Sequence, residues 1–318
     1  MKNKKILIVG GNGFIGRNLA RMLSKREDLE VYSFDLALPK EEMTGVQYIE
    51  GDFFDDLVLE NAVKGMDLII HSLSTVNPGN SNEKYMQGYG RDFLQTIKLC
   101  KMLIDQGSNM IFLSSGGTVY GVQEEQPIKE DALPVPINHY GSVKLCIENV
   151  IRTFNSQRHT KMRIARISNP FGPGQDYHKG VGFVDAAIKK SICKETLEIW
   201  GDGENIRDYI YIEDVCKMLE ALVDYEGEEE VFNLSSNEGI SQNMVIDILK
   251  KIDGEFEVAY KPARSVDVRK IVLDNSKIKQ IYKGEIRTFE TGVKEYYSYL
   301  TNKINERANP PAMLGRIV

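Results

Sequence analysis

The sequence predicts an α/β protein: a parallel sheet, doubly wound with helices on both faces, followed by a smaller C-terminal α/β lobe. Two observations support this prediction. The first half of the chain alternates short apolar runs with longer amphipathic segments, which is the pattern of strand–helix–strand units. The chain also has 318 residues, more than most single domains, so a second lobe is expected.

Six apolar runs are predicted to be buried or half-buried strands of the parallel sheet: Lys5–Val9, Glu30–Phe34, Val46–Ile49, Leu68–His71, Met110–Ser114 and Met162–Ile167. Helical periodicity predicts helices from about Phe14 to Ser24 and from Asn138 to Phe154. Gly and Pro gather directly after Pro170 and mark a loop. We therefore expect a first domain over residues 1–170, to which residues 210–235 return, and a second lobe over residues 171–318.

Composition excludes several classes of function. The net charge of −6, without a concentrated basic stripe, argues against a nucleic-acid surface. No apolar run is long enough to span a bilayer, so no membrane partner is expected. The basic N-terminus runs into a glycine cluster rather than a cleavage site. The four cysteines are scattered without metal-ligand spacing, which favours reduced thiols in the cytoplasm and predicts no metal site.

A glycine motif lies between the first predicted strand and the first predicted helix. Residues 10–16 read Gly-Gly-Asn-Gly-Phe-Ile-Gly, with the spacing G-x-x-G-x-x-G. Glycine permits a tight turn and lets backbone N–H groups approach a pyrophosphate at the positive end of the helix dipole. This context predicts a dinucleotide site, and the residues expected to contact the cofactor are Gly10, Gly13, Phe14, Ile15 and Gly16.

An acid at the end of the second predicted strand specifies the cofactor further. Asp35 is placed to accept hydrogen bonds from a ribose diol, and no arginine follows it closely to hold a 2′-phosphate. The sequence therefore favours NAD over NADP, although an aspartate there could also be a helix cap. Asp52 and Phe53 follow the third strand and are candidate adenine contacts. The alternative for Asp52 is a simple turn aspartate.

The candidate catalytic pair is Tyr140 and Lys144, four residues apart on the second predicted helix. Their side chains therefore leave the same helix face, one turn apart. A phenol is a poor base near neutral pH, but a neighbouring ammonium and a nicotinamide cation both lower its pKa. The pair predicts a tyrosine base supported by a lysine.

These motifs together resemble the extended short-chain dehydrogenase/reductase family over nearly the whole chain. They are residues 10–16, Asp35, the run Ser-Ser-Gly-Gly-Thr-Val-Tyr-Gly at residues 114–121, and Tyr140 with Lys144. Within that family the chain is most similar to nucleotide-sugar epimerases of the UDP-glucose 4-epimerase type. The resemblance implies a Rossmann-type sheet with a sugar-nucleotide lobe, and NAD, which Lys144 would contact through the nicotinamide ribose. It also implies a UDP-sugar substrate and a homodimer through helices near residues 85–105 and 138–155.

The function implied by this resemblance is epimerisation of a nucleotide sugar at the 4-position, through a transient 4-keto intermediate. A 4,6-dehydratase of the family usually has an Asp-Glu pair where this chain has Gly117 and Thr118. A 4-keto reductase is a further alternative. A non-catalytic NAD-binding sensor is the alternative outside enzymes.

The chain departs from the family pattern at two places. The family's catalytic Ser or Thr corresponds to Gly116, so Ser115, Thr118 or a water is expected to replace that hydroxyl. The alternative is that Ser115 and Thr118 only satisfy local backbone groups. The family often has an asparagine near the cofactor where this chain has Tyr89 by our alignment.

The resemblance also implies residues that hold the sugar nucleotide. Asn169 begins a loop whose asparagine contacts substrate, and Arg207 begins a signature in which the arginine binds the diphosphate. Further candidates are Tyr209 in that signature, Arg264 as a second diphosphate ligand, and Phe183, Leu197 and Ile199 for the base. The alternatives are a surface ion pair for the arginine and ordinary core positions for the apolar residues.

Overall fold

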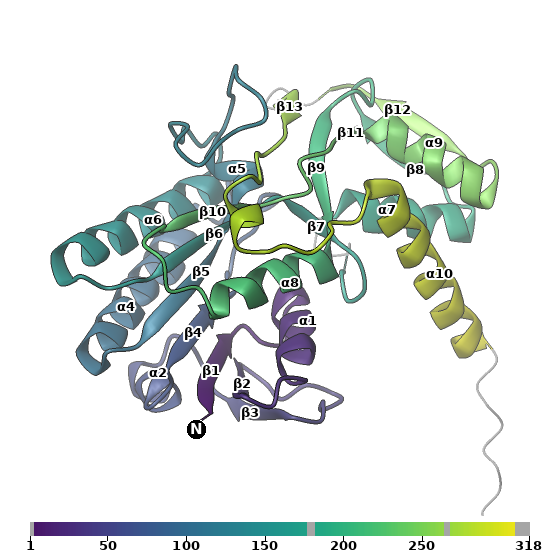
Figure 1. Ribbon diagram of the computed structural model, residues 1–318. Coiled ribbons are helices and arrows are strands. Elements are labelled where there is room, and N and C mark those ends of the chain that lie inside the picture. Colours follow the sequence, from purple (N-terminus) through teal and green to yellow (C-terminus); the bar gives the residue numbers. More distant parts are fainter. Residues whose placement is uncertain (1–2, 177–181, 264–267, 309–318) are drawn as a thin grey trace, which may run out of the picture.

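The fold is described from a computed structural model, which covers residues 3–176, 182–263 and 268–308 (Figure 1). The first elements along the chain are β1 (Lys4–Val9), α1 (Phe14–Leu23), β2 (Leu29–Asp35), β3 (Val46–Glu50), α2 (Asp56–Val63), β4 (Leu68–His71), α3 (Tyr85–Gln87), η1 (Gly88–Phe93), α4 (Leu94–Gln106), β5 (Asn109–Ser115), α5 (Gly116–Val119) and α6 (His139–Arg158). They are followed by β6 (Arg163–Ile167), β7 (Asn169–Phe171), α7 (Phe183–Cys193), β8 (Leu197–Trp200), β9 (Ile206–Tyr211), α8 (Ile212–Val223), β10 (Val231–Leu234), β11 (Gly239–Ser241), α9 (Gln242–Asp253), β12 (Val258–Lys261), β13 (Lys270–Ile271), η3 (Ile278–Gln280) and α10 (Phe289–Ala308). The segment η1 is a π-helix, and η3 is a 3-10 helix.

Seven of the described strands form a parallel central sheet in the order β10-β6-β5-β4-β1-β2-β3. The strand order reverses between β1, which leads to β2, and β4, which leads to β5. Open α/β sheets bind ligands at the carboxyl ends of the strands beside such a reversal. The Rossmann-type fold class predicted from the sequence is confirmed.

Helices cover both faces of this sheet. Figure 1 shows α4 and α6 on one side, and α1 and α8 on the other. Leu19 of α1 and Leu219 of α8 share one apolar core with Ile8 of β1. The opposite core joins the sheet to residues of α2, α4 and α6. Because both faces are covered, β4 and β6 are buried at every residue, which explains why β4 is apolar from Leu68 to Ile70 without alternation.

The predicted strands and helices agree closely with those observed. Each of the six predicted strands is present within one residue of its predicted bounds. Helix α1 ends at Leu23, and α6 continues to Arg158, beyond its predicted end. The helix that carries the candidate pair Tyr140 and Lys144 is therefore longer than predicted, but its first turn lies where the sequence places it.

The remaining elements build a smaller lobe with its own apolar core. Strand β9 pairs with β7 and β13 in parallel and with β11 in antiparallel orientation, while β8 pairs with β12. Helices α7, α9 and α10 pack around these strands, and Figure 1 shows α10 extending away from the central sheet. The chain returns to the central sheet through α8 and β10, so the two parts are linked more than once.

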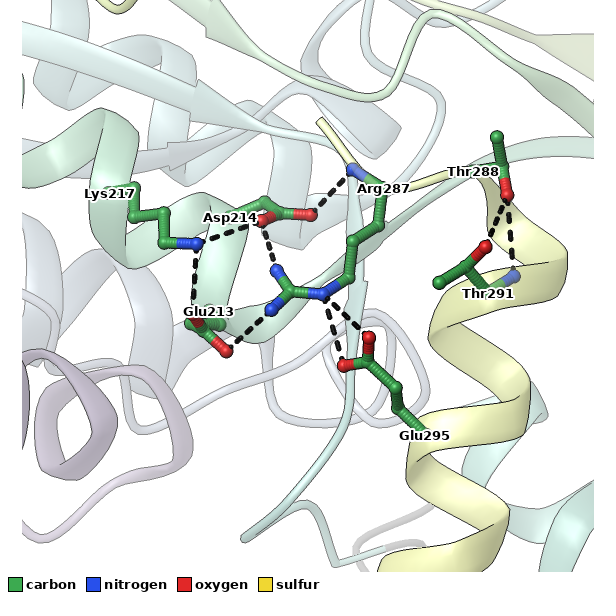
Figure 2. A network of polar contacts seen from close by, with 7 residues as sticks. All are labelled: Glu213, Asp214, Lys217, Arg287, Thr288, Thr291 and Glu295. Atoms are coloured by element: carbon green, nitrogen blue, oxygen red, sulfur yellow. Dashed lines mark hydrogen bonds and ion pairs between the residues drawn. The ribbon is translucent and has the colours of Figure 1, made fainter. Parts of the chain in front are cut away.

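A polar network ties α8 to the segment that leads into α10 (Figure 2). Arg287 donates hydrogen bonds to Asp214 and, at 2.8 Å, to Glu213, both at the start of α8. Its Nε donates at 3.0 Å to Glu295 of α10. Asp214 has no exposed surface, so Arg287 compensates a buried carboxylate.

None of the helices within the described ranges combines the length and the apolar character needed to cross a membrane.

Candidate active site

A cavity of about 490 Å³ opens at the carboxyl ends of the central strands. Its wall includes Phe14 and Ile15 from the glycine turn and α1, Ser74 from the segment after β4, and Tyr140 and Lys144 of α6. The other side is formed by the smaller lobe and the segments leading to it, including Asn169, Phe183, Trp200, Arg207, Tyr209 and Gln242. Most of the predicted catalytic and substrate residues therefore line one cavity.

The glycine turn has the close packing that a phosphate cradle requires. Gly10 has φ +80°, a conformation that other residues rarely adopt. A Cβ atom on Gly16 would lie 2.4 Å from the Gly10 carbonyl oxygen, so the turn and the helix start meet in a space that only glycine fits. Helix α1 has no side-chain cap at Gly13, which leaves its first N–H groups facing the turn. These features fit the pyrophosphate of a dinucleotide.

Asp35 lies at the end of β2, beside the glycine turn. Its Oδ2 accepts a hydrogen bond from the Asn12 backbone N–H at 2.9 Å, and its Oδ1 accepts one from Leu36 N–H at 2.8 Å. The carboxylate is thus fixed where β2 meets the turn, which fits the predicted ribose contact.

Asp52 and Phe53 lie outside the lining of the cavity. Asp52 is exposed, and its Oδ1 accepts a hydrogen bond from Phe54 N–H at 2.9 Å, as a turn aspartate does. Phe53 is 2% exposed and its ring packs 5.1 Å from that of His71. The Phe53 side chain belongs to the core, so only its main chain is available to a cofactor.

Tyr140 and Lys144 extend from the first turns of α6 into the cavity. Asn138 caps the helix by accepting a hydrogen bond from Gly141 N–H at 2.8 Å. The Lys144 Nζ lies 5.6 Å from the centre of the Tyr140 ring and donates to the Leu113 carbonyl at 2.9 Å. Both side chains are therefore held on one face of α6, as the four-residue spacing predicts.

The electrostatics of this pair depend on a third residue. Burial raises the pKa of Tyr140 to about 12, and the negative charge of Asp92 contributes to the rise. Burial lowers the pKa of Lys144 to about 8, which Asp92 and Glu148 partly oppose. Lys144 is consequently protonated at neutral pH, while Tyr140 needs additional positive charge nearby before it can act as a base.

Gly116 has no hydroxyl, and the structure shows which neighbouring residues line the cavity in its place. A Cβ atom there would lie 2.3 Å from Leu273 Cδ1 and 3.2 Å from the Arg166 carbonyl oxygen, so its side chain would point away from the cavity. The neighbours Ser115, Gly117 and Thr118 line the cavity instead. The Thr118 Oγ1 is buried without a hydrogen-bond partner among the described residues, which leaves it available to a ligand.

The side of the cavity formed by the smaller lobe and the segments leading to it contains most of the predicted substrate-binding residues. Asn169 donates through Nδ2 to the Asp208 carbonyl at 2.9 Å, and Arg207 lies beside Asp208 on β9. Phe183 starts α7, and Tyr209 is 6% exposed, with its ring 5.4 Å from that of Phe289. Arg264 lies outside the described residues.

Two of the apolar candidates belong to the core rather than to the cavity. Leu197 and Ile199 are buried in the core of the smaller lobe and are not part of the wall. Sequence reasoning missed Trp200, which lies next to them on β8 and does line the cavity. The alternating burial of β8 gives the reason, since successive side chains point to opposite faces. As the single tryptophan of the chain, next to the Gly201–Gly203 turn, it could have been identified from the sequence.

Asp92 is another residue near the cavity that the sequence did not reveal. Our alignment placed Tyr89 at the family's asparagine position, but the Tyr89 hydroxyl contacts His139 Nδ1 at 3.3 Å and does not line the cavity. Asp92 is buried on η1 and is bonded to Ser74 of the cavity wall. No periodic pattern marks this contact, because it joins a π-helix to a loop.

Comparisons with known proteins agree with this geometry. The family model of the NAD dependent epimerase/dehydratase family matches residues 6–235. The dTDP-4-dehydro-6-deoxyglucose reductase of Escherichia coli is 28% identical, over 85% of this chain and 88% of that protein. The UDP-glucose 4-epimerase of Rhizobium meliloti is 26% identical, over 88% of this chain and 92% of that protein. The crystal structure of the Thermotoga maritima UDP-glucose 4-epimerase with UDP-glucose is 28% identical with a TM-score of 0.87, over 94% of this chain and 99% of that one.

Proposed function

Because the chain belongs to the NAD-dependent epimerase/dehydratase family, we propose that it is an NAD-dependent enzyme that inverts a nucleotide sugar at the 4-position. The substrate we propose is a UDP-sugar, since epimerases among the relatives act on UDP-glucose. The supporting observation is that one cavity collects Tyr140, Lys144 and the unpartnered Thr118 hydroxyl beside residues of the glycine turn.

In the proposed mechanism Tyr140 removes the proton of the sugar 4-hydroxyl and later returns it. Lys144 keeps a positive charge beside the phenol, which favours its ionised form. Thr118 or Ser115 donates a hydrogen bond to the sugar oxygen as charge develops there. Bound NAD supplies the oxidation of carbon 4 and its reduction from the opposite face, through a transient 4-keto sugar.

Other residues of the wall hold the two ligands. We assign the cofactor to the turn with Gly10, Gly13, Phe14, Ile15 and Gly16, to Asp35, and to contacts of Asp52 and the Phe53 main chain. We assign the substrate diphosphate to Arg207, whose planar guanidinium suits phosphate, and to Arg264. Asn169, Phe183 and Tyr209 complete the substrate side of the proposal.

Three further parts of the proposal concern the whole protein. Residues 1–170 with 210–235 are proposed as the cofactor domain, and residues 171–318 as mainly the substrate lobe. A homodimer through α4 and α6 would cover exposed apolar side chains such as Leu94, which is 52% exposed. The four free cysteines suit the reducing cytoplasm, which is the location we propose. Light scattering of the purified protein tests the dimer.

The function is tested by incubating the purified protein with a panel of UDP-sugars, without added cofactor, and identifying products by NMR. A 4-epimer is the expected product. Tyr140→Phe is the matched control, which should abolish turnover while leaving NAD binding unchanged, because only the phenolic oxygen is removed. A 4-keto-6-deoxy product would contradict the proposal in favour of a dehydratase. Unchanged turnover in the Phe variant would exclude Tyr140 as the base.

A reductase is the second candidate, because the Escherichia coli relative reduces a 4-keto sugar nucleotide according to its name. That activity would consume added NADH in a fixed ratio to product, whereas an epimerase consumes none. A dehydratase is disfavoured because none of the described residues in the cavity wall is Asp or Glu, so the wall lacks a carboxylate pair for elimination.

A further inference from the structure

The charged side chains in the described part of the active-site cavity wall are all cationic. Among its described residues Lys144 and Arg207 are cations, and there is no carboxylate. The oxidised nicotinamide ring of NAD adds another positive charge, whereas the reduced ring is neutral. A site with a buried ammonium alone would therefore favour the reduced cofactor, because like charges repel strongly in a low dielectric.

Asp92 supplies a negative charge from directly behind this wall. It is 3% exposed, and its Oδ2 accepts hydrogen bonds from Ser74 Oγ at 2.9 Å and from Thr75 N–H at 2.8 Å. Its Oδ1 accepts from Thr75 Oγ1 at 2.6 Å. All three donors are neutral, so none of them forms an ion pair with the carboxylate. Ser74 itself lines the cavity, which places one residue between this charge and the ligand.

The π-helix that carries Asp92 packs tightly against the catalytic helix. A Cβ atom on Gly88 of η1 would lie 3.1 Å from Val143 Cγ2, and Val143 directly precedes Lys144 on α6. Because the two helices approach so closely, the charge of Asp92 acts on both Lys144 and Tyr140. It raises the pKa of Lys144, which burial lowers. It also raises the pKa of Tyr140, which burial raises as well. A π-helix inside a longer helical segment is frequent at functional sites.

The other ionisable groups around Lys144 do not provide this charge. Glu148, one turn further along α6, is fully buried and forms an ion pair with Arg166 at 2.6 Å, so the pair is neutral overall. His71 of β4 is held uncharged at neutral pH, since burial and Lys144 lower its pKa to about 3. Of the groups described around Lys144, Asp92 is the one with an unpaired negative charge.

We propose that Asp92 sets the redox preference of the site, by balancing Lys144 so that the cationic, oxidised nicotinamide is bound in preference to the reduced one. This inference rests on the proposed NAD-dependent function. An enzyme whose net reaction leaves its cofactor oxidised needs this preference, because tightly held NADH without the keto sugar would be an inactive complex. Asp92 acts through Ser74 and the field in the cavity, so it is a positioning residue and not a catalytic one.

The test compares Asp92→Asn with Thr75→Val in the purified full-length protein. Asparagine retains the shape of the side chain and can still accept the bond from Thr75 N–H, but it removes the charge. Valine at 75 removes one hydrogen bond to Asp92 and leaves the charge. NADH binding is followed by its fluorescence, and NAD binding by displacement of NADH. The measured quantity is the ratio of the dissociation constant of NAD to that of NADH.

We expect Asp92→Asn to raise this ratio about tenfold, the size expected for one charge inside a protein, and Thr75→Val to leave it near the wild-type value. The pH profile of turnover should also move to lower pH in Asp92→Asn, because both Tyr140 and Lys144 lose a neighbouring negative charge. An unchanged ratio in Asp92→Asn would overturn the inference, as would an equal shift in Thr75→Val. Failure of the wild type to bind either cofactor would instead overturn the proposed function.

Discussion

Thr118 is a candidate to donate a hydrogen bond beside the proposed base Tyr140, because both residues line the cavity. Its Oγ1 is buried at the cavity wall without a partner in the described structure, so no folding interaction depends on it. We predict that Thr118→Val lowers kcat roughly a hundredfold, the usual effect of losing one donor to a developing oxyanion, with little change in the free energy of unfolding. Steady-state kinetics and urea denaturation test this. Ser115→Ala is the comparison, and a larger loss of kcat there would assign the role to Ser115.

Gly116 allows a second prediction at the scale of single residues. Restoring the family's serine at this position should not raise activity, because the new Cβ would meet Leu273 Cδ1 at 2.3 Å and point away from the cavity. We expect Gly116→Ser to lower the free energy of unfolding by about 1–3 kcal/mol through overpacking, as measured in urea. Gly90→Ser is the matched control, since a Cβ atom added to Gly90 would have no described neighbour within 4 Å. Higher kcat in Gly116→Ser would contradict this account.

The same residues show what sequence alone can give at this scale. Tyr140 and Lys144 were predictable because their spacing and the helix periodicity are local properties. The direction of a side chain at Gly116 was not, since it depends on Leu273, which lies against Gly116 but belongs to a distant part of the chain. Asp92 was missed for a similar reason, because its hydrogen-bond partners lie in the loop after β4 and its own π-helix has no sequence signature.

At the scale of elements, all the central strands except β10 were predicted, and so was the presence of a smaller lobe, but the strands of that lobe were not. Strands such as β1 and β4 have side chains that are buried on both faces of the sheet, and they stand out in the sequence as short apolar runs. The strands of the smaller lobe are short, and β13 has only two residues. Their pairing with β9 brings together segments far apart in sequence, and no local pattern encodes such pairing.

The Arg287 network gives a prediction for the junction of α8 and α10. Arg287→Met should lower the free energy of unfolding by about 3 kcal/mol, because it leaves the fully buried Asp214 without its hydrogen-bonded cation. Lys217 does not replace it, since its Nζ is 3.9 Å from Asp214 Oδ1. Urea denaturation measures the effect. Lys101→Met is the comparison: it removes an exposed ion pair with Asp105 and should lower the free energy of unfolding by about 0.5 kcal/mol or less. Equal losses in the free energy of unfolding for the two variants would show that Arg287 does not stabilise the buried Asp214 carboxylate.

For the whole molecule, the position of the cavity follows from topology. The central sheet presents its carboxyl ends at the reversal between β1 and β4, and the chain crosses into the smaller lobe directly after β6. Residues at the carboxyl ends of the central strands therefore meet residues of the smaller lobe, such as Arg207, across one cavity. The sheet that positions the site also buries a histidine at its centre, and this links the stability of the entire fold to pH.

His71 lies at the end of β4 and is 1% exposed. Thr96 Oγ1 donates to the Asp92 carbonyl at 2.7 Å, so it accepts at 2.9 Å from the Nε2–H of a neutral His71 ring. Burial first, and Lys144 second, lower the pKa of His71 from 6.5 to about 3. The folded state therefore binds fewer protons than the unfolded chain between these two values, and stability must fall as pH falls through that window.

We predict that wild-type protein loses about 2 kcal/mol of unfolding free energy between pH 7 and pH 5 through His71 alone, because the unfolded histidine takes up a proton that the folded one cannot. His71→Leu should lack this part of the loss, so its urea midpoint should fall less over the same interval. His159→Asn is the control, since His159 is exposed and its positive φ suits asparagine. If His71→Leu shows the wild-type dependence on pH, protons enter the folded sheet and the buried histidine is not the group that limits stability in acid.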